Sequence, residues 1–136
     1  MKKILIIVER GNDGFYSVYS PNTEFTVLNG QGATVENAIS DMKQALQEII
    51  ESYNESDEEL PAELSGNIEF EYKYDVASLF NHFDEINLSS FARKIGMNGS
   101  LLRKYKNGLA FASEKQCRKI ETGLQQLGQS LCAASL

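Results

Sequence analysis

The most suggestive stretch of this sequence for chemistry is SSFARKIGMNGSLLRKYKNG, residues 89–108. It contains five cationic side chains and no carboxylate. Over the wider range 87–119, eight Lys and Arg side chains stand against a single acid, Glu114. Lysine and arginine bind phosphate oxygens, and arginine also forms paired hydrogen bonds with the edge of guanine. This segment therefore predicts a surface for nucleic acid.

The formal net charge of the whole 136-residue chain is nevertheless −6. It divides unevenly, because residues 1–75 have a balance of −10 and residues 76–136 a balance of +4. The pattern predicts an acidic N-terminal part joined to a basic C-terminal part. The overall negative charge is therefore no argument against a DNA-binding surface in the second part.

Helical periodicity is expected to position the basic side chains. The second of four predicted short helices runs from Leu88 to Ile95, and Gly96 follows it where a left-handed C-cap is needed. Asn98 can cap the third helix, and Gly108 can end it. The inward-facing side chains of these two helices are expected to be Leu88, Phe91, Ala92, Ile95, Leu102 and Tyr105.

This spacing of helix, three-residue turn and helix resembles the helix-turn-helix of phage-repressor-like (Xre-type) DNA-binding domains. The resemblance covers roughly residues 76–122 and implies that the helix from Gly99 to Lys106 enters the major groove. It rests on Phe91, Ala92, Gly96, Asn98, Leu102, Tyr105 and Gly108. The implied base contacts are Asn98, Gly99, Ser100, Arg103 and Lys104. The implied phosphate contacts are Asn87, Ser89, Lys106 and Asn107.

The first 75 residues have the alternation of a sheet. KKILIIVER (2–10) predicts a strand covered on both faces, because its apolar centre is continuous. FYSVYS (15–20) and EFTVLN (24–29) predict the other two strands of an antiparallel meander. NIEFEYKYD (67–75) alternates strictly and predicts a half-exposed fourth strand.

A helix capped by Thr34 is expected between the third and fourth strands, with one apolar stripe along its length. The predicted fold class is α+β. A small β-β-β-α-β domain spans residues 1–75, and an all-helical helix-turn-helix domain with a C-terminal helix spans residues 76–136.

The passage GQGATVENA at 30–38 resembles the G…T-x-E-x-A passage of the HicB antitoxin family, and the order of the two parts is similar to that family over essentially the whole chain. The resemblance implies an RNase H-like N-terminal domain without catalysis, which binds and masks a small basic ribonuclease toxin, HicA. It also implies a C-terminal domain that binds the promoter DNA of its own operon. The expected function is thus that of an autoregulating antitoxin.

Two alternatives stay open. One is a stand-alone helix-turn-helix transcription regulator whose N-terminal domain senses another ligand or partner. The other is a metal-dependent RNase H-like nuclease, which would need carboxylates to hold its ions. The centre of the first strand, Ile4 to Val8, supplies none, and His82 has no partner nearby in the sequence. We therefore assign no catalytic residue, metal ligand or cofactor, and expect a protein that is not an enzyme.

The C-terminal stripe of Cys117, Ile120, Leu124, Leu127 and Leu131 has the spacing of a helix seam. It either closes the core of the helical domain or, in its later part, pairs two subunits. A homodimer or higher oligomer is expected, since DNA-reading helices of this kind usually work in pairs. The first apolar run is too short for a signal peptide, and no segment approaches the ~20 apolar residues of a membrane span, so a cytoplasmic protein is expected.

Overall fold

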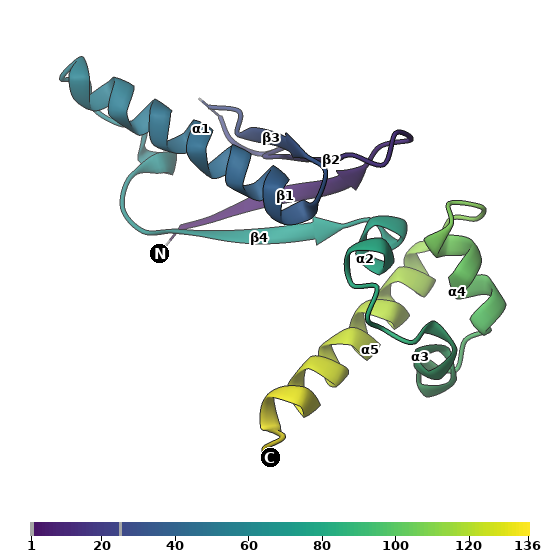
Figure 1. Ribbon diagram of the computed structural model, residues 1–136. Helices are drawn as coiled ribbons and strands as arrows, with labels where there is room; N and C mark the ends of the chain where they lie inside the picture. Colours follow the sequence, from purple (N-terminus) through teal and green to yellow (C-terminus); the bar gives the residue numbers. More distant parts are fainter. Residues whose placement is uncertain (1, 25) are drawn as a thin grey trace. The chain divides into compact units, whose positions relative to one another are not determined.

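The computed structural model describes residues 2–24 and 26–136. It confirms the α+β class, since these residues form a four-stranded mixed sheet and five α-helices (Figure 1). The chain divides into two compact units, one ending at Ser78 and the other beginning at Leu79. This division falls inside α2 (Val76–His82), three residues after the expected boundary. No helix in the described ranges has the length and apolar content needed to cross a bilayer.

The sheet of the first unit has the strand order β3-β2-β1-β4. Its first three strands form an antiparallel meander, as predicted, although the third strand does not lie where the sequence predicts it. Strand β4 lies parallel to β1 at the edge of the sheet. A parallel neighbour needs a long crossover, which is supplied here by α1 (Val35–Glu55) and the short 3-10 helix η1 (Ala62–Leu64). The strands are β1 (Lys2–Arg10), β2 (Tyr16–Tyr19), β3 (Asn29–Gly32) and β4 (Ile68–Tyr74).

Helix α1 covers one face of this sheet, along which it runs in Figure 1. The predicted cap at Thr34 is confirmed, because its Oγ1 accepts a hydrogen bond from the backbone N–H of Asn37 (3.1 Å). The stripe of α1 packs on the inward-facing side chains of the strands. The buried core of the unit includes Ile4, Ile6, Val8, Val18, Leu28, Val35, Ala38, Met42, Leu46 and Leu64.

The expectation of a strand over residues 24–29 is wrong, since the third strand runs from Asn29 to Gly32. The backbone N–H groups of Glu24 and Thr26 donate to the carboxylate of Glu63 (2.8 and 3.1 Å) instead of joining a ladder, and residue 25 lies outside the described residues. The strand contains Gly30 because α1 crosses it closely, and a Cβ there would collide with the carbonyl oxygen of Ala38.

The prediction that the first strand is covered on both faces is also wrong. Ile4, Ile6 and Val8 are buried beneath α1, whereas Leu5 and Ile7 on the other face are partly exposed. The continuous apolar run reflects one buried face and one partly exposed apolar face.

In the second unit, α5 (Glu114–Ala133) packs against α3 (Leu88–Ile95), and α3 against α4 (Gly99–Lys106). The rings of Phe80 and Phe91 meet edge to face, with 6.1 Å between centroids. Helix α5 is continuous through both of its glycines, and its first half closes the core, whereas Leu131 is 65% exposed. The buried side chains are Phe80, Phe91, Ala92, Leu102, Tyr105 and Ile120.

The two glycines of α5 offer a matched test of this packing. A Cβ at Gly123 would collide with the Ile95 side chain and lie 3.2 Å from the Phe91 ring, whereas a Cβ at Gly128 would meet nothing within 4 Å. We expect Gly123→Ala to lower the free energy of unfolding by about 1–3 kcal/mol. Gly128→Ala should raise it by up to about 1 kcal/mol, because alanine favours the helix. Urea denaturation of both variants measures the difference, and equal effects would contradict the close approach of α3 and α5.

Tyr74 at the end of β4 gives the first unit a pH dependence. Its pKa is raised above the ordinary value of 10.0, mainly by burial and further by Tyr72, Glu36 and Tyr16. As pH rises, the Tyr74 hydroxyl therefore loses its proton in the unfolded chain before it does so in the folded chain. The free energy of unfolding should consequently fall as pH rises above 10.0. Tyr74→Phe should show a shallower fall than wild type in urea denaturation at pH 8 and above pH 10, with Tyr53→Phe as the control. Identical pH dependence in all three proteins would contradict this effect.

Candidate nucleic-acid interface

The turn between α3 and α4 sets the geometry of the candidate interface. Gly96 has φ +73° and ψ +36°, the left-handed conformation that the sequence predicts for this C-cap. The chain then reverses tightly, with the backbone N–H of Met97 donating to the carbonyl of Ala92 (2.9 Å). Three residues separate the end of α3 from the start of α4, as expected.

Two asparagines cap the helices on either side of this turn. The Oδ1 of Asn98 accepts hydrogen bonds from the backbone N–H groups of Ser100 (2.8 Å) and Leu101 (3.4 Å), which confirms its predicted capping role. The Oδ1 of Asn87 does the same at the start of α3, accepting from the N–H of Ser90 (3.0 Å). Both candidate contact residues therefore position a helix end with their carbonyl oxygens.

Burial fixes the rotation of α4 about its axis. Leu102 and Tyr105 face inward, with 0% and 5% of their surface exposed. Ser100, Arg103 and Lys104 are exposed in consequence, while Gly99 and Lys106 are partly buried. The side chain of Asn81, which sequence analysis did not single out, also fixes this helix by donating to the carbonyl of Lys106 (2.8 Å). Only the fold brings these two residues together, because they are 25 positions apart.

Arg103 links the two helices across the turn. Its Nη1 donates to the hydroxyl of Ser89 on α3, and its Nη2 donates to the hydroxyl of Ser100 on α4, both at 3.1 Å. Gly99 lies beneath the guanidinium, since a Cβ there would stand 3.4 Å from Nη1. Arg103, a predicted base contact, thus lies against Ser89, a predicted phosphate contact.

A hollow of about 390 Å³ opens beside this linkage. It brings together all four predicted phosphate contacts and only one of the predicted base contacts, Arg103. Asn98, Gly99, Ser100 and Lys104 do not line it. Two apolar residues also line it: Ile86, which the sequence did not single out, and Leu88, which was expected on the inward face of its helix. The complete lining is Ile86, Asn87, Leu88, Ser89, Arg103, Lys106 and Asn107.

The basic side chains of this unit differ in how they are engaged. Arg118 pairs with Glu114 at 3.4 Å, and the ammonium of Lys119 donates to the carbonyl of Gly96 (3.3 Å). Arg93 donates to the hydroxyl of Ser90. The ammonium groups of Lys94, Lys104, Lys106 and Lys115, by contrast, make no hydrogen bond or ion pair with any residue that the structure describes. The count of eight cations in the sequence therefore overstates how many are free to meet a ligand.

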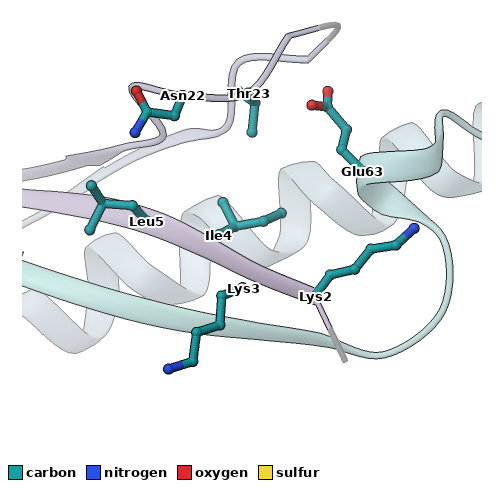
Figure 2. A pocket seen from close by; sticks show the side chains of 7 residues that line it. All are labelled: Lys2, Lys3, Ile4, Leu5, Asn22, Thr23 and Glu63. Carbon is teal, nitrogen blue, oxygen red and sulfur yellow. The ribbon is translucent and has the colours of Figure 1, made fainter.

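A second hollow of about 390 Å³ lies in the first unit, at the start of β1 (Figure 2). Its lining comes from β1, from Asn22 and Thr23 after β2, and from Glu63 of η1. Two of its three charged side chains already serve the fold, since Glu63 accepts two backbone N–H groups and the Nζ of Lys2 donates to Ser65 (2.9 Å). The hollow beside Arg103 is therefore the stronger candidate for a ligand site.

Within residues 2–24 and 26–136, no group of three or more His, Cys, Asp or Glu side chains is arranged to hold a metal ion. No family model, curated protein or solved structure matches this chain. The function of the α3–α4 surface therefore rests on its own residues and geometry.

Capping by Asn98 gives the first test of this surface. Asn98→Ala should lower the free energy of unfolding by about 1 kcal/mol, because the N–H groups at the start of α4 lose their acceptor. Asn98→Ser keeps a capping oxygen and should stay within a few tenths of a kcal/mol of wild type. Urea denaturation and amide hydrogen exchange at Ser100 and Leu101 measure the effect. Unchanged exchange in Asn98→Ala would contradict this cap.

Proposed function

We propose that this protein is a DNA-binding regulator of the HicB antitoxin type, which binds the promoter DNA of its own operon through α3 and α4. The observation that carries the proposal is the hollow at the α3–α4 turn, where Arg103 and Lys106 join Asn87, Ser89 and Asn107. Its lining includes no carboxylate. Such a hollow suits a group that only accepts hydrogen bonds and carries negative charge, as a DNA phosphate does.

The orientation of α4 supports insertion into the major groove. A recognition helix needs its N-terminal and outward residues free, while its opposite face packs into the domain. Helix α4 meets this condition, since Leu102 is buried and Ser100 and Lys104 are exposed. In this proposal the start of α3 and the end of α4, which line the same hollow, contact the sugar-phosphate backbone together at one edge of the groove.

The charge balance supports two different partners for the two units. The acidic surplus of −10 lies in residues 1–75 and the basic surplus in residues 76–136. Exposed charges farther apart than about 8 Å are largely screened at physiological ionic strength. Each charge therefore acts mainly on groups close to it, and a net charge of −6 is compatible with DNA binding by the cations of α4.

The antitoxin part of the proposal concerns the first unit. Its element order β-β-β-α-β is the one expected for a HicB-like domain, and its acidic surplus complements a basic ribonuclease such as HicA. In this proposal the unit masks the toxin and has no catalytic role of its own. A dimer then presents two copies of α4 to half-sites about 34 Å apart on the DNA.

DNA binding is tested with the full chain and a labelled duplex from directly upstream of its own reading frame. We expect the logarithm of the binding constant to fall linearly with the logarithm of salt concentration. The expected slope is about 0.9 log units per neutralised phosphate for each tenfold rise in salt. Arg103→Ala with Lys104→Ala should weaken binding at least about tenfold. Lys3→Ala with Lys73→Ala removes the same charge from the first unit and should change affinity little. Equal losses from both pairs would contradict a specific role for α4.

The antitoxin role is tested by co-expression with the product of the adjacent reading frame. We expect a small basic partner that co-purifies with the full chain and whose ribonuclease activity is suppressed in the complex. A complex that still cleaves RNA, or no complex at all, would leave DNA binding intact but contradict the antitoxin role. That result would favour the stand-alone regulator.

A further inference from the structure

We propose that Ser89 and Ser100 are positioning residues that hold Arg103 against the DNA backbone, so that base reading by α4 falls to Lys104. This inference rests on the proposed DNA-binding function and changes its detail, because the helix-turn-helix resemblance places Arg103 and Lys104 together among the base contacts. Arg103 and Lys104 are neighbours in the sequence but differ in their surroundings.

Two hydrogen bonds hold the guanidinium of Arg103 in position. Each of its terminal nitrogens donates to a serine hydroxyl at 3.1 Å, one on α3 and one on α4. Gly99 leaves room for this arrangement, since a Cβ there would stand within 3.4 Å of Nη1. An arginine held from two helices loses less rotamer freedom on binding than a free one.

The guanidinium held in this way can still bind a phosphate group. Arginine has five N–H donors, and the two serines accept from two of them. Three donors are left, enough for the paired oxygens of a phosphate group. Both serines are neutral, so they orient the side chain without cancelling its charge. A carboxylate in place of either hydroxyl would cancel it.

Arg103 and Lys104 lie in different places relative to the hollow. Arg103 lines the hollow together with Asn87, Ser89, Lys106 and Asn107, the four residues expected at the backbone. Lys104 is outside this lining, is exposed, and has no side-chain partner in the described part of the chain. A phosphate in the hollow would accept from Arg103 and Lys106 at once, whereas the free ammonium of Lys104 can reach acceptors on a base edge such as guanine O6 and N7.

The experiment compares two duplexes, the DNA upstream of the reading frame and a scrambled duplex of the same composition, over a range of salt concentrations. Arg103→Ala should weaken binding to both duplexes by the same factor and reduce the salt slope by about 1. Lys104→Ala should instead reduce the preference for the upstream duplex. Thermal unfolding of each variant confirms that it is folded.

Ser89 is tested by a double-mutant cycle on the same duplexes. Ser89→Ala should weaken binding about 3- to 10-fold in the wild-type background and have no further effect once Arg103 is alanine. Ser89→Thr keeps the hydroxyl and should restore wild-type affinity. Ser90→Ala is the matched control, because Ser90 accepts from Arg93 at the same 3.1 Å but does not line the hollow.

Two results would overturn this inference while leaving DNA binding in place. One is a loss of sequence preference in Arg103→Ala with an unchanged salt slope, which would make Arg103 a base reader. The other is an equal effect of Ser89→Ala with and without Arg103, which would mean that Ser89 acts independently. If the wild-type chain binds neither duplex at any salt concentration, the proposed function itself fails and this inference with it.

Discussion

The left-handed conformation of Gly96 is the constraint on which the arrangement of α3 and α4 depends. Only with this reversal can Met97 close back on Ala92, leaving Asn98 to begin α4 after three residues. The apolar residues of α4 then fix its rotation, and Arg103 is carried to a place where it reaches Ser89. The hollow beside Arg103 is thus a consequence of turn geometry and core packing. Any residue with a side chain in place of Gly96 would strain the backbone of the turn between α3 and α4.

Charge acts locally in this molecule. The acidic residues are concentrated before residue 76 and the cations near the turn, so each unit presents a different electrostatic surface to its surroundings. Within the second unit, several cations already hold the fold together, as Lys119 does when it donates to the carbonyl of Gly96. On α4, Arg103, Lys104 and Lys106 form no ion pair with any residue that the structure describes, and in the proposed function they are the cations that a ligand meets.

Much of this architecture could be predicted from the sequence because it depends on local rules. The caps at Thr34, Asn98 and Gly96 and the inward faces of α3 and α4 follow from side-chain chemistry and helical period. The position of the third strand could not be predicted from the sequence. It depends on how closely α1 crosses Gly30 and on the carboxylate of Glu63, 37 residues away, which accepts from the backbone N–H of Thr26. The contact of Arg103 with Ser89 was beyond reach for the same reason, since it exists only after the turn has folded.

In the proposed function, DNA meets the α3–α4 surface of the second unit. Amide hydrogen exchange of the full chain, with and without the duplex from upstream of its reading frame, tests it directly. Protection should appear at the start of α3 and along α4, while the strands of the first unit exchange as they do in the free protein. Protection confined to the first unit, or none in either, would contradict the account.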